Sequence, residues 1–253
     1  MSEAEQFSFA ELPLALMQGA ALHAGGASKL PSYIAGHRHR LRERFLNGGP
    51  SAMPDYELLE LVLFRANTRA DVKPLAHALL RQFGDFNQVI SAPIEKLTKV
   101  RGVGLAIATE LKIIEAAAQR MSRARVMHRN VISSWDALLD YCHTSMAHRE
   151  TEQFRILFLD RKNVLIADEE QARGTVDHVP VYPREVAKRA LELNASALIL
   201  VHNHPSGDPD PSDSDIAMTS RIHEVLSALG ITLHDHLIIG RGREFSFRSA
   251  GYL

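Results

Sequence analysis

The sequence predicts an all-α N-terminal domain followed by an α/β domain built on a mixed sheet. Between residues 54 and 121, apolar side chains recur at the spacing of amphipathic helices. From residue 154 onward, apolar runs of strand length alternate with helical stretches, which is typical of one sheet covered by helices. The charge also changes: residues 37–130 carry 16 basic and 9 acidic side chains, and residues 131–253 carry 12 and 18.

The first part of the chain predicts a tail and a compact helical domain. Residues 1–36 are interpreted as a disordered tail with at most one short helix over 10–21. The domain is expected over 37–121 and joins short helices by short connections. A polar, basic stretch at 122–130 is interpreted as the linker. The first expected helix begins at Pro54. Four more are expected at about 72–83, 86–92, 93–97 and 105–121.

The second domain is expected over 131–253. Its longest apolar run, 197–201, predicts a buried strand, and Pro183 and Ser212 are placed to begin helices. The remaining elements alternate strands with turns. We expect strands at 154–159, 164–167, 232–239 and 244–248, an extended segment at 175–181, and helices at 183–194 and 212–229.

The composition is typical of a globular protein in a reducing compartment. Hydrophobic residues make up 45% of the chain, and a single cysteine, Cys142, excludes an internal disulfide framework. Cys142 is better explained by a half-buried helix position than by a nucleophile. No apolar run approaches the roughly 18 residues that span a bilayer, and the first residues are acidic, unlike a signal peptide. We therefore expect a cytoplasmic protein with no membrane partner.

Two histidines at the end of the buried strand indicate a metal site. His202 and His204 are two residues apart, so in an extended backbone their imidazoles point to the same side. Asp215 follows after a loop rich in proline and glycine. Two imidazoles and one carboxylate leave the fourth position of a tetrahedral zinc ion open for water, and zinc makes that water acidic enough to supply hydroxide.

The same residues also allow a structural interpretation. Ser212 and Asp215 have the spacing of a capping box at the start of a helix. The histidines alone would be ordinary surface residues. Capping and ligation are compatible, because a capped first turn would aim the Asp215 carboxylate at the metal.

The segment His202-Asn203-His204-Pro205-Ser206-Gly207-Asp208-Pro209, followed by Pro211-Ser212 and Asp215, resembles the signature of the RadC family. It also fits the JAMM (MPN+) metalloprotease pattern. The resemblance covers roughly residues 37–253. It implies a cytidine-deaminase-like (MPN) fold with one Zn²⁺ per chain, held by His202, His204 and Asp215, and a peptide or isopeptide substrate. Ser212 matches the serine that stabilises the oxyanion.

The JAMM pattern also requires an upstream glutamate as general acid and base. Glu152, immediately before the first strand, is our choice, and Glu169 and Glu170 are the alternatives. A second His-x-His cluster, His234-Asp235-His236, matches no ligand of the family. We expect it to support a ligand imidazole, for example by holding its tautomer.

The basic part of the chain resembles a helix-hairpin-helix motif around Lys99, Arg101, Gly102 and Gly104. Such a turn presents backbone N–H groups beside a helix N-terminus, which holds a phosphate without reading sequence. Lys96 and Lys112 would add cationic contacts. Alternatively, the glycines form a plain tight turn, or the surface docks a protein partner.

Three functions are compatible with these patterns. The first is a zinc hydrolase of the metallopeptidase type, recruited to DNA by the helical domain. The second is a DNA-repair or recombination accessory protein that binds DNA non-specifically and holds zinc for structure. The third is nuclease chemistry at the same zinc. Preference for a peptide bond rests on the family resemblance.

Overall fold

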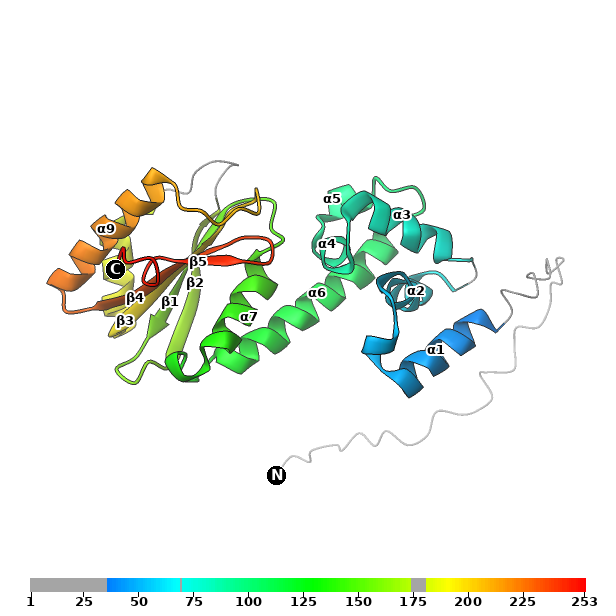
Figure 1. Ribbon diagram of the computed structural model, residues 1–253, viewed down its shortest axis with the longest axis horizontal. Coiled ribbons are helices and arrows are strands. Elements are labelled where there is room, and N and C mark those ends of the chain that lie inside the picture. The colour runs from blue at the N-terminus through cyan, green and yellow to red at the C-terminus, as the bar shows by residue number, and fades with distance from the viewer. Residues whose placement is uncertain (1–35, 69, 174–180) are drawn as a thin grey trace, which may run out of the picture.

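The structure is a computed structural model that describes residues 36–68, 70–173 and 181–253. The expected tail helix over 10–21 and nearly all of the expected extended segment at 175–181 lie outside these residues. Within them, the predicted order of a helical domain and a mixed-sheet domain is confirmed (Figure 1). No helix in this part of the chain is long and apolar enough to cross a membrane.

Within residues 36–68 and 70–126, six α-helices pack around one core. A helix over residues 37–48 was not expected, and it is held by the guanidinium of Arg38, which donates to the Asn67 carbonyl at 2.7 Å. Fully buried leucines from separate helices, such as Leu59, Leu79 and Leu111, form the core. The helices are α1 His37–Gly48, α2 Asp55–Ala66, α3 Lys73–Phe83, α4 Phe86–Ser91, α5 Ile94–Leu97 and α6 Leu105–Val126, with a 3-10 turn at Pro50–Ala52.

Helix α6 is longer than expected and runs toward the sheet domain (Figure 1). It continues beyond Met121 to Val126, so residues 122–126 of the predicted linker are helical. The basic side chains Arg123 and Arg125 occupy its last turn, where positive charge interacts favourably with the helix dipole. Val126 is fully buried in the core of the sheet domain. The polarity of this stretch therefore marks an exposed helix surface rather than a break.

The second domain is a five-stranded sheet in the order β2-β1-β3-β4-β5. Among the strands of the described residues, β3 and β4 alone run parallel to each other, and α9 connects them. Helix α7 packs on one face, and α8 and α9 pack on the other. The elements are α7 Trp135–Met146, β1 Gln153–Leu159, β2 Leu165–Arg173, α8 Pro183–Glu192, β3 Ala197–Asn203, α9 Asp213–Ala228, β4 Thr232–Ile239 and β5 Glu244–Ser246, with a 3-10 turn at Ile132–Ser134.

Two strands extend beyond their predicted ends. β3 continues through His202 and Asn203, because β1 and β4 pair with it on both sides. β2 runs to Arg173 despite its polar sequence. It is an edge strand, where charged side chains are well tolerated.

Cys142 is buried in α7, more deeply than expected. Burial raises the pKa of its thiol to about 12, so the thiolate is not available near neutral pH. This environment supports its interpretation as a core residue.

Candidate metal centre

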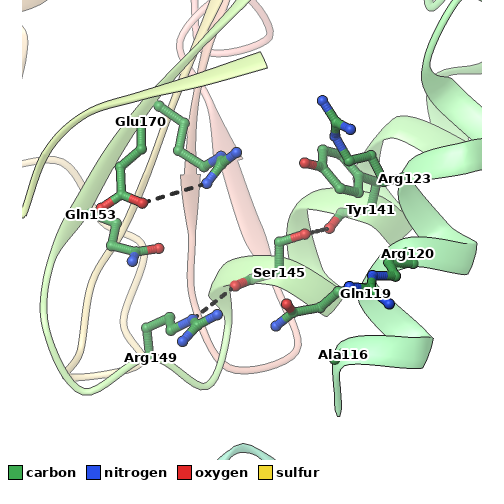
Figure 2. Close-up of a pocket in the computed structure, with 10 residues that line it drawn as sticks. Ala116, Gln119, Arg120, Arg123, Tyr141, Ser145, Arg149, Gln153 and Glu170 are labelled. Carbon is green, nitrogen blue, oxygen red and sulfur yellow. Dashed lines mark hydrogen bonds and ion pairs between the residues drawn. The ribbon is translucent and has the colours of Figure 1, made fainter. Parts of the chain in front are cut away.

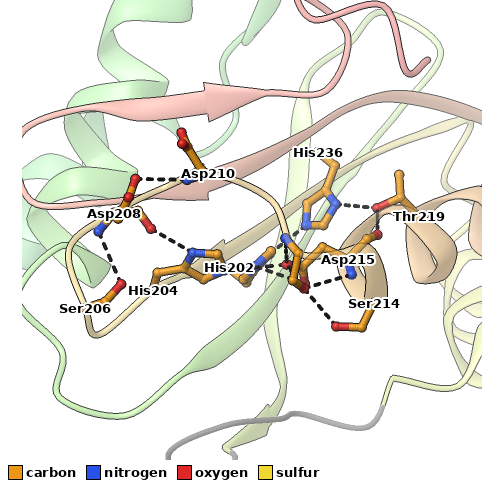
Figure 3. Close-up of polar contacts among 10 residues, drawn as sticks. His202, His204, Ser206, Asp208, Asp210, Ser214, Asp215, Thr219 and His236 are labelled. Atoms are coloured by element: carbon orange, nitrogen blue, oxygen red, sulfur yellow. Dashed lines mark hydrogen bonds and ion pairs between the residues drawn. The ribbon is translucent and has the colours of Figure 1, made fainter.

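Three side chains meet at the carboxyl end of β3 and the first turn of α9 (Figure 3). The Nε2 atoms of His202 and His204 are 3.1 Å apart. The His202 Nε2 lies 3.4 Å from Asp215 Oδ1, and the His204 Nε2 lies 3.6 Å from Asp215 Oδ2. Tetrahedral zinc with ligands about 2.05 Å away separates those ligands by about 3.3 Å. This group therefore has the spacing that a metal ion requires.

The loop between β3 and α9 brings Asp215 back to the histidines. The His204 N–H donates to the Ile239 carbonyl at 3.1 Å, which extends the β3–β4 pairing into the loop. The Arg241 N–H donates to the Gly207 carbonyl at 3.0 Å. A Cβ at Gly240 would lie only 2.5 Å from that carbonyl oxygen, so the loop approaches β4 at a place where only glycine fits.

A hydrogen-bonded relay determines which nitrogen of His202 faces the site. The Thr219 hydroxyl donates to the Asp215 carbonyl at 2.6 Å, and a carbonyl can only accept. Thr219 Oγ1 must then accept from His236 Nδ1, 2.6 Å away, so His236 Nε2 is unprotonated. His202 Nδ1 therefore donates to His236 Nε2 at 2.7 Å. The lone pair of His202 Nε2 is left to point at the site.

His204 is also oriented by a hydrogen bond from its Nδ1, in this case to a backbone carbonyl rather than to another side chain. His204 Nδ1 lies 2.8 Å from the Asp208 carbonyl oxygen, to which it donates. Its Nε2 lone pair also faces the site. Carbonyl acceptors that orient the ligand histidine from behind are typical of metal centres. Both imidazoles are thus in the tautomer that coordinates a metal.

Burial keeps His202 neutral. It is completely buried and stacks on Phe154 with ring centroids 5.9 Å apart, and burial lowers its pKa to about 4. His236 is also fully buried, and burial lowers its pKa well below the usual value. Neutral imidazoles keep the lone pairs that a metal needs.

His204 and Asp215, which are less buried than His202, each have a pKa shifted toward the charged form. The carboxylate of Asp215, 3.6 Å from His204 Nε2, is the main cause that raises the pKa of His204, against the effect of burial. Burial raises the pKa of Asp215. The neighbouring imidazoles of His204 and His202 and the hydrogen bonds from Ser212 lower it by more, so the pKa of Asp215 is well below its usual range. Asp215 is therefore an anionic acceptor beside two imidazoles.

Ser212 and Asp215 form the predicted capping box. The Asp215 N–H donates to Ser212 Oγ at 3.2 Å, while the Ser212 N–H and hydroxyl donate to Asp215 Oδ2 at 2.8 and 2.5 Å. Oδ2 is thereby occupied, and Oδ1 is left facing His202. Capping and the orientation of a metal ligand are two results of one arrangement.

Among the three glutamates, the structure brings Glu152 near the histidines. Phe154 pairs with His202 at the end of the β1–β3 ladder, and Glu152 is two residues before Phe154 in the chain. The negative charge of Glu152 contributes to the raised pKa of His204.

The alternatives are occupied elsewhere. Arg189 donates to both carboxylate oxygens of Glu169, at 2.6 and 2.8 Å. Glu170 lies 3.8 Å from a guanidinium nitrogen of Arg155. Both glutamates are on β2, which β1 separates from β3.

Comparisons with known proteins agree with this architecture. Residues 132–252 match the RadC-like JAB domain family, and residues 35–109 match the UPF0758 N-terminal family. The UPF0758 protein of Ruegeria pomeroyi is 75% identical over 224 residues, which is 88% of this chain and all of the relative. A UPF0758 protein of Rhodobacter capsulatus is 73% identical over 84% of this chain and its own full length. The chain belongs to the RadC-like (UPF0758) family.

The sequence did not single out two residues of the RadC-like centre, Thr219 and Asn203. Thr219 lies one helical turn after Asp215 on the buried face of α9, and a buried threonine at that spacing is a usable signal. Asn203 lies between the two histidines but points to the other face of the sheet. Its Oδ1 accepts from the Gln153 N–H at 2.9 Å. It thereby holds the segment that carries Glu152.

The residues expected to contact DNA lie in the helical domain, between α5 and the beginning of α6. Gly102 has a φ of +95°, and Gly104 begins α6 without a side-chain cap, so N–H groups of its first turn remain available. Lys99 and Arg101 line a hollow on this surface together with Arg81.

Two further cations are engaged by the protein itself. Lys96 lies 2.8 Å from a Glu150 oxygen. Lys112 is turned inward, donating to the Ile90 carbonyl and to Glu115, both at 2.9 Å. Lys112 is therefore a poor candidate for a phosphate contact.

Proposed function

We propose that the RadC-like domain is a zinc-dependent hydrolase of the JAMM metallopeptidase type, acting on a peptide or isopeptide bond in the cytoplasm. The observation that carries this proposal is the convergence of His202 Nε2, His204 Nε2 and Asp215 at the mutual separations that ligands of one metal ion require, with both imidazole tautomers set for coordination. Three protein ligands are the number found in catalytic zinc sites, whereas structural sites use four.

The proposed chemistry divides between the metal and the chain. Zinc held by His202, His204 and Asp215 would supply hydroxide near neutral pH and would polarise a carbonyl group. Glu152, immediately before β1 and near enough to His204 for its charge to act on that imidazole, would take the proton from the attacking water and pass it to the leaving amine. The Glu152 residue is half-buried.

Ser212 would stabilise the oxyanion that develops on the substrate carbonyl. Its hydroxyl already points into the centre, where it donates to Asp215 Oδ2. Redirecting that proton to the oxyanion exchanges one charge-assisted hydrogen bond for another. Because the Ser212 N–H also donates to Oδ2, the carboxylate stays oriented during the exchange.

Zinc content tests the ligand assignment. The purified protein should contain about one zinc per chain, and a His202→Ala plus His204→Ala variant should contain almost none. His223→Ala, an exposed histidine on α9, is the matched control and should keep the wild-type content. Equal zinc in the double variant and the wild type would refute the assignment. Substrate panels then separate the chemistries: cleavage of phosphodiesters that is lost in Asp215→Asn, without cleavage of peptides, would favour the nuclease.

A second function, non-specific DNA binding by the helical domain with zinc in a structural role, is favoured by the basic hollow of Arg81, Lys99 and Arg101 beside the Gly102 turn. Fluorescence anisotropy with duplex DNA should show binding that weakens steeply as salt increases. The Lys99→Gln plus Arg101→Gln variant should bind more weakly. Its slope of log binding constant against log salt concentration should be shallower by about two, which corresponds to about two lost phosphate contacts. Absence of binding at low salt would rule out this function.

A further inference from the structure

A second cavity lies between α6, α7 and the β1–β2 edge of the sheet (Figure 2). Its volume is about 390 Å³. Guanidinium groups dominate its polar lining, which contains a single carboxylate, Glu170. The arginines are Arg120, Arg123, Arg149 and Arg155. The cavity is on the α7 side of β1, whereas the metal centre is on the α9 side, so its properties do not depend on the proposed hydrolase.

A buried carboxylate organises one wall of this cavity. The Asp168 side chain is fully buried and accepts from Arg155 Nε at 2.9 Å and from Arg155 Nη2 at 2.8 Å. The Tyr141 hydroxyl also donates to Asp168. A buried charge is retained only when it is paired and hydrogen-bonded in this way. Arg155 is consequently held in one orientation at the cavity.

Among the described residues, the other three arginines make no ion pair shorter than 3.9 Å. Arg123 approaches Asp168 only to 3.9 Å, and Arg149 approaches Glu115 only to 3.9 Å. Glu115 already accepts from Lys112 at 2.9 Å. Arg120 has no ion-pair partner among the described residues. Like charges around one hollow repel each other, and an anion would relieve that repulsion.

We propose that this cavity binds a phosphate-bearing ligand of about nucleotide size. Planar guanidinium groups match phosphate oxygens with paired hydrogen bonds, and arginine is preferred over lysine where such recognition matters. The volume is within the range of small-molecule pockets, roughly 300–1,000 Å³. The ligand is either a free nucleotide or a phosphate of a nucleic-acid strand, because both offer the same group to the arginines.

The backbone connects this cavity to the beginning of β1. Gln153 lines the cavity, and its N–H is held by Asn203. Glu152 precedes it and faces the opposite side of the sheet. A ligand in the cavity would therefore contact the strand that carries Glu152 without approaching His202 or His204.

Calorimetric titration of the full-length protein tests the inference. The probes are ATP, pyrophosphate, and a short single-stranded oligodeoxynucleotide, each without added metal. The Arg123→Gln plus Arg149→Gln variant should bind at least about tenfold more weakly than the wild type, because each lost guanidinium group removes a pair of charge-assisted hydrogen bonds to phosphate. Arg129→Gln plus Arg221→Gln, two exposed arginines outside the cavity, is the matched control. Arg123→Lys keeps the charge and should lose part of the affinity. Circular dichroism melting checks that each variant is folded.

The outcomes separate the sources of phosphate. Binding of ATP and pyrophosphate that the cavity arginines control assigns the site to a free nucleotide. Binding of the oligonucleotide alone, with the same dependence, assigns it to a nucleic-acid strand. Failure of all three probes to bind at low salt, or equal weakening in the cavity variant and the control, would overturn the proposal.

Discussion

The side-chain oxygen of Asn203 accepts a hydrogen bond of 2.9 Å from the backbone N–H of Gln153. The Asn203 amide also donates to the Thr151 carbonyl at 3.2 Å. Asn203 lies between His202 and His204 on β3, and Glu152 lies between Thr151 and Gln153. One amide thus joins the strand of the proposed ligands to the segment of the proposed general base.

Replacing Asn203 should loosen that segment. In Asn203→Leu the buried Gln153 N–H loses its acceptor, and leaving such a group unsatisfied costs about 1–3 kcal/mol. Asn203→Asp retains the acceptor and should protect the Gln153 amide better from hydrogen exchange. Hydrogen exchange at Gln153 and urea unfolding measure both effects. Unchanged Gln153 protection in Asn203→Leu would contradict the role of the clamp.

Thr219 should affect zinc affinity without touching the metal. Thr219→Val cannot accept from His236, so the relay no longer selects the His202 tautomer. Loss of such a supporting group typically weakens metal binding about 10- to 100-fold. Thr219→Ser retains the hydroxyl and should restore most of the affinity. Competition with a chromophoric chelator gives the dissociation constants. Equal weakening by both substitutions would indicate a packing effect instead.

Asp215→Asn should separate capping from ligation. The asparagine side-chain oxygen can still accept from the Ser212 N–H, so the start of α9 should be nearly as stable as in the wild type. The lost negative charge should sharply reduce zinc content. Thermal unfolding of the metal-free proteins and zinc analysis make the comparison. A large loss of stability in the metal-free variant would show that the capping box requires the carboxylate.

Glu152→Gln should abolish turnover while zinc remains bound. Removing a general base typically costs 10²- to 10⁴-fold in rate. Glu169→Gln is the control on β2: it removes one oxygen from the Arg189 pair and should leave the rate close to that of the wild type. Once a cleaved substrate is known, steady-state rates and zinc content decide between them. A larger rate loss in Glu169→Gln would reverse the assignment.

The stability of the metal-free protein should decrease as the pH falls from about 6.5 to about 4. Over this interval unfolded His202 binds a proton that the folded residue, with a pKa of about 4, does not. This stabilisation is fully present above pH 6.5, and about 3 kcal/mol of it is lost by pH 4. Urea unfolding across this range, in the presence of a chelator, measures it. His202→Asn can still donate to His236 and should show a shallower slope; equal slopes would contradict the assignment.

Local sequence patterns were sufficient to predict the central residues of the candidate metal centre. His202 and His204 share a side because of strand geometry, and Ser212 and Asp215 form a helix cap, so short-range spacing alone predicted this group and its capping box. The same local patterns predicted both domains. They misplaced the end of α6, because its final residues are polar yet remain helical where they meet the sheet domain.

Only the tertiary structure decided what surrounds that group. The pairing of β1 with β3 brings Glu152, the residue before β1, near His204, and the β3–β4 pairing with α9 above it aligns His202, His236 and Thr219. The arginine-lined cavity likewise combines side chains from α6, α7 and the sheet. These contacts join residues far apart in the chain. Helical and strand periodicity describe neighbours along the sequence, whereas such pairs depend on which strands pair and in which register.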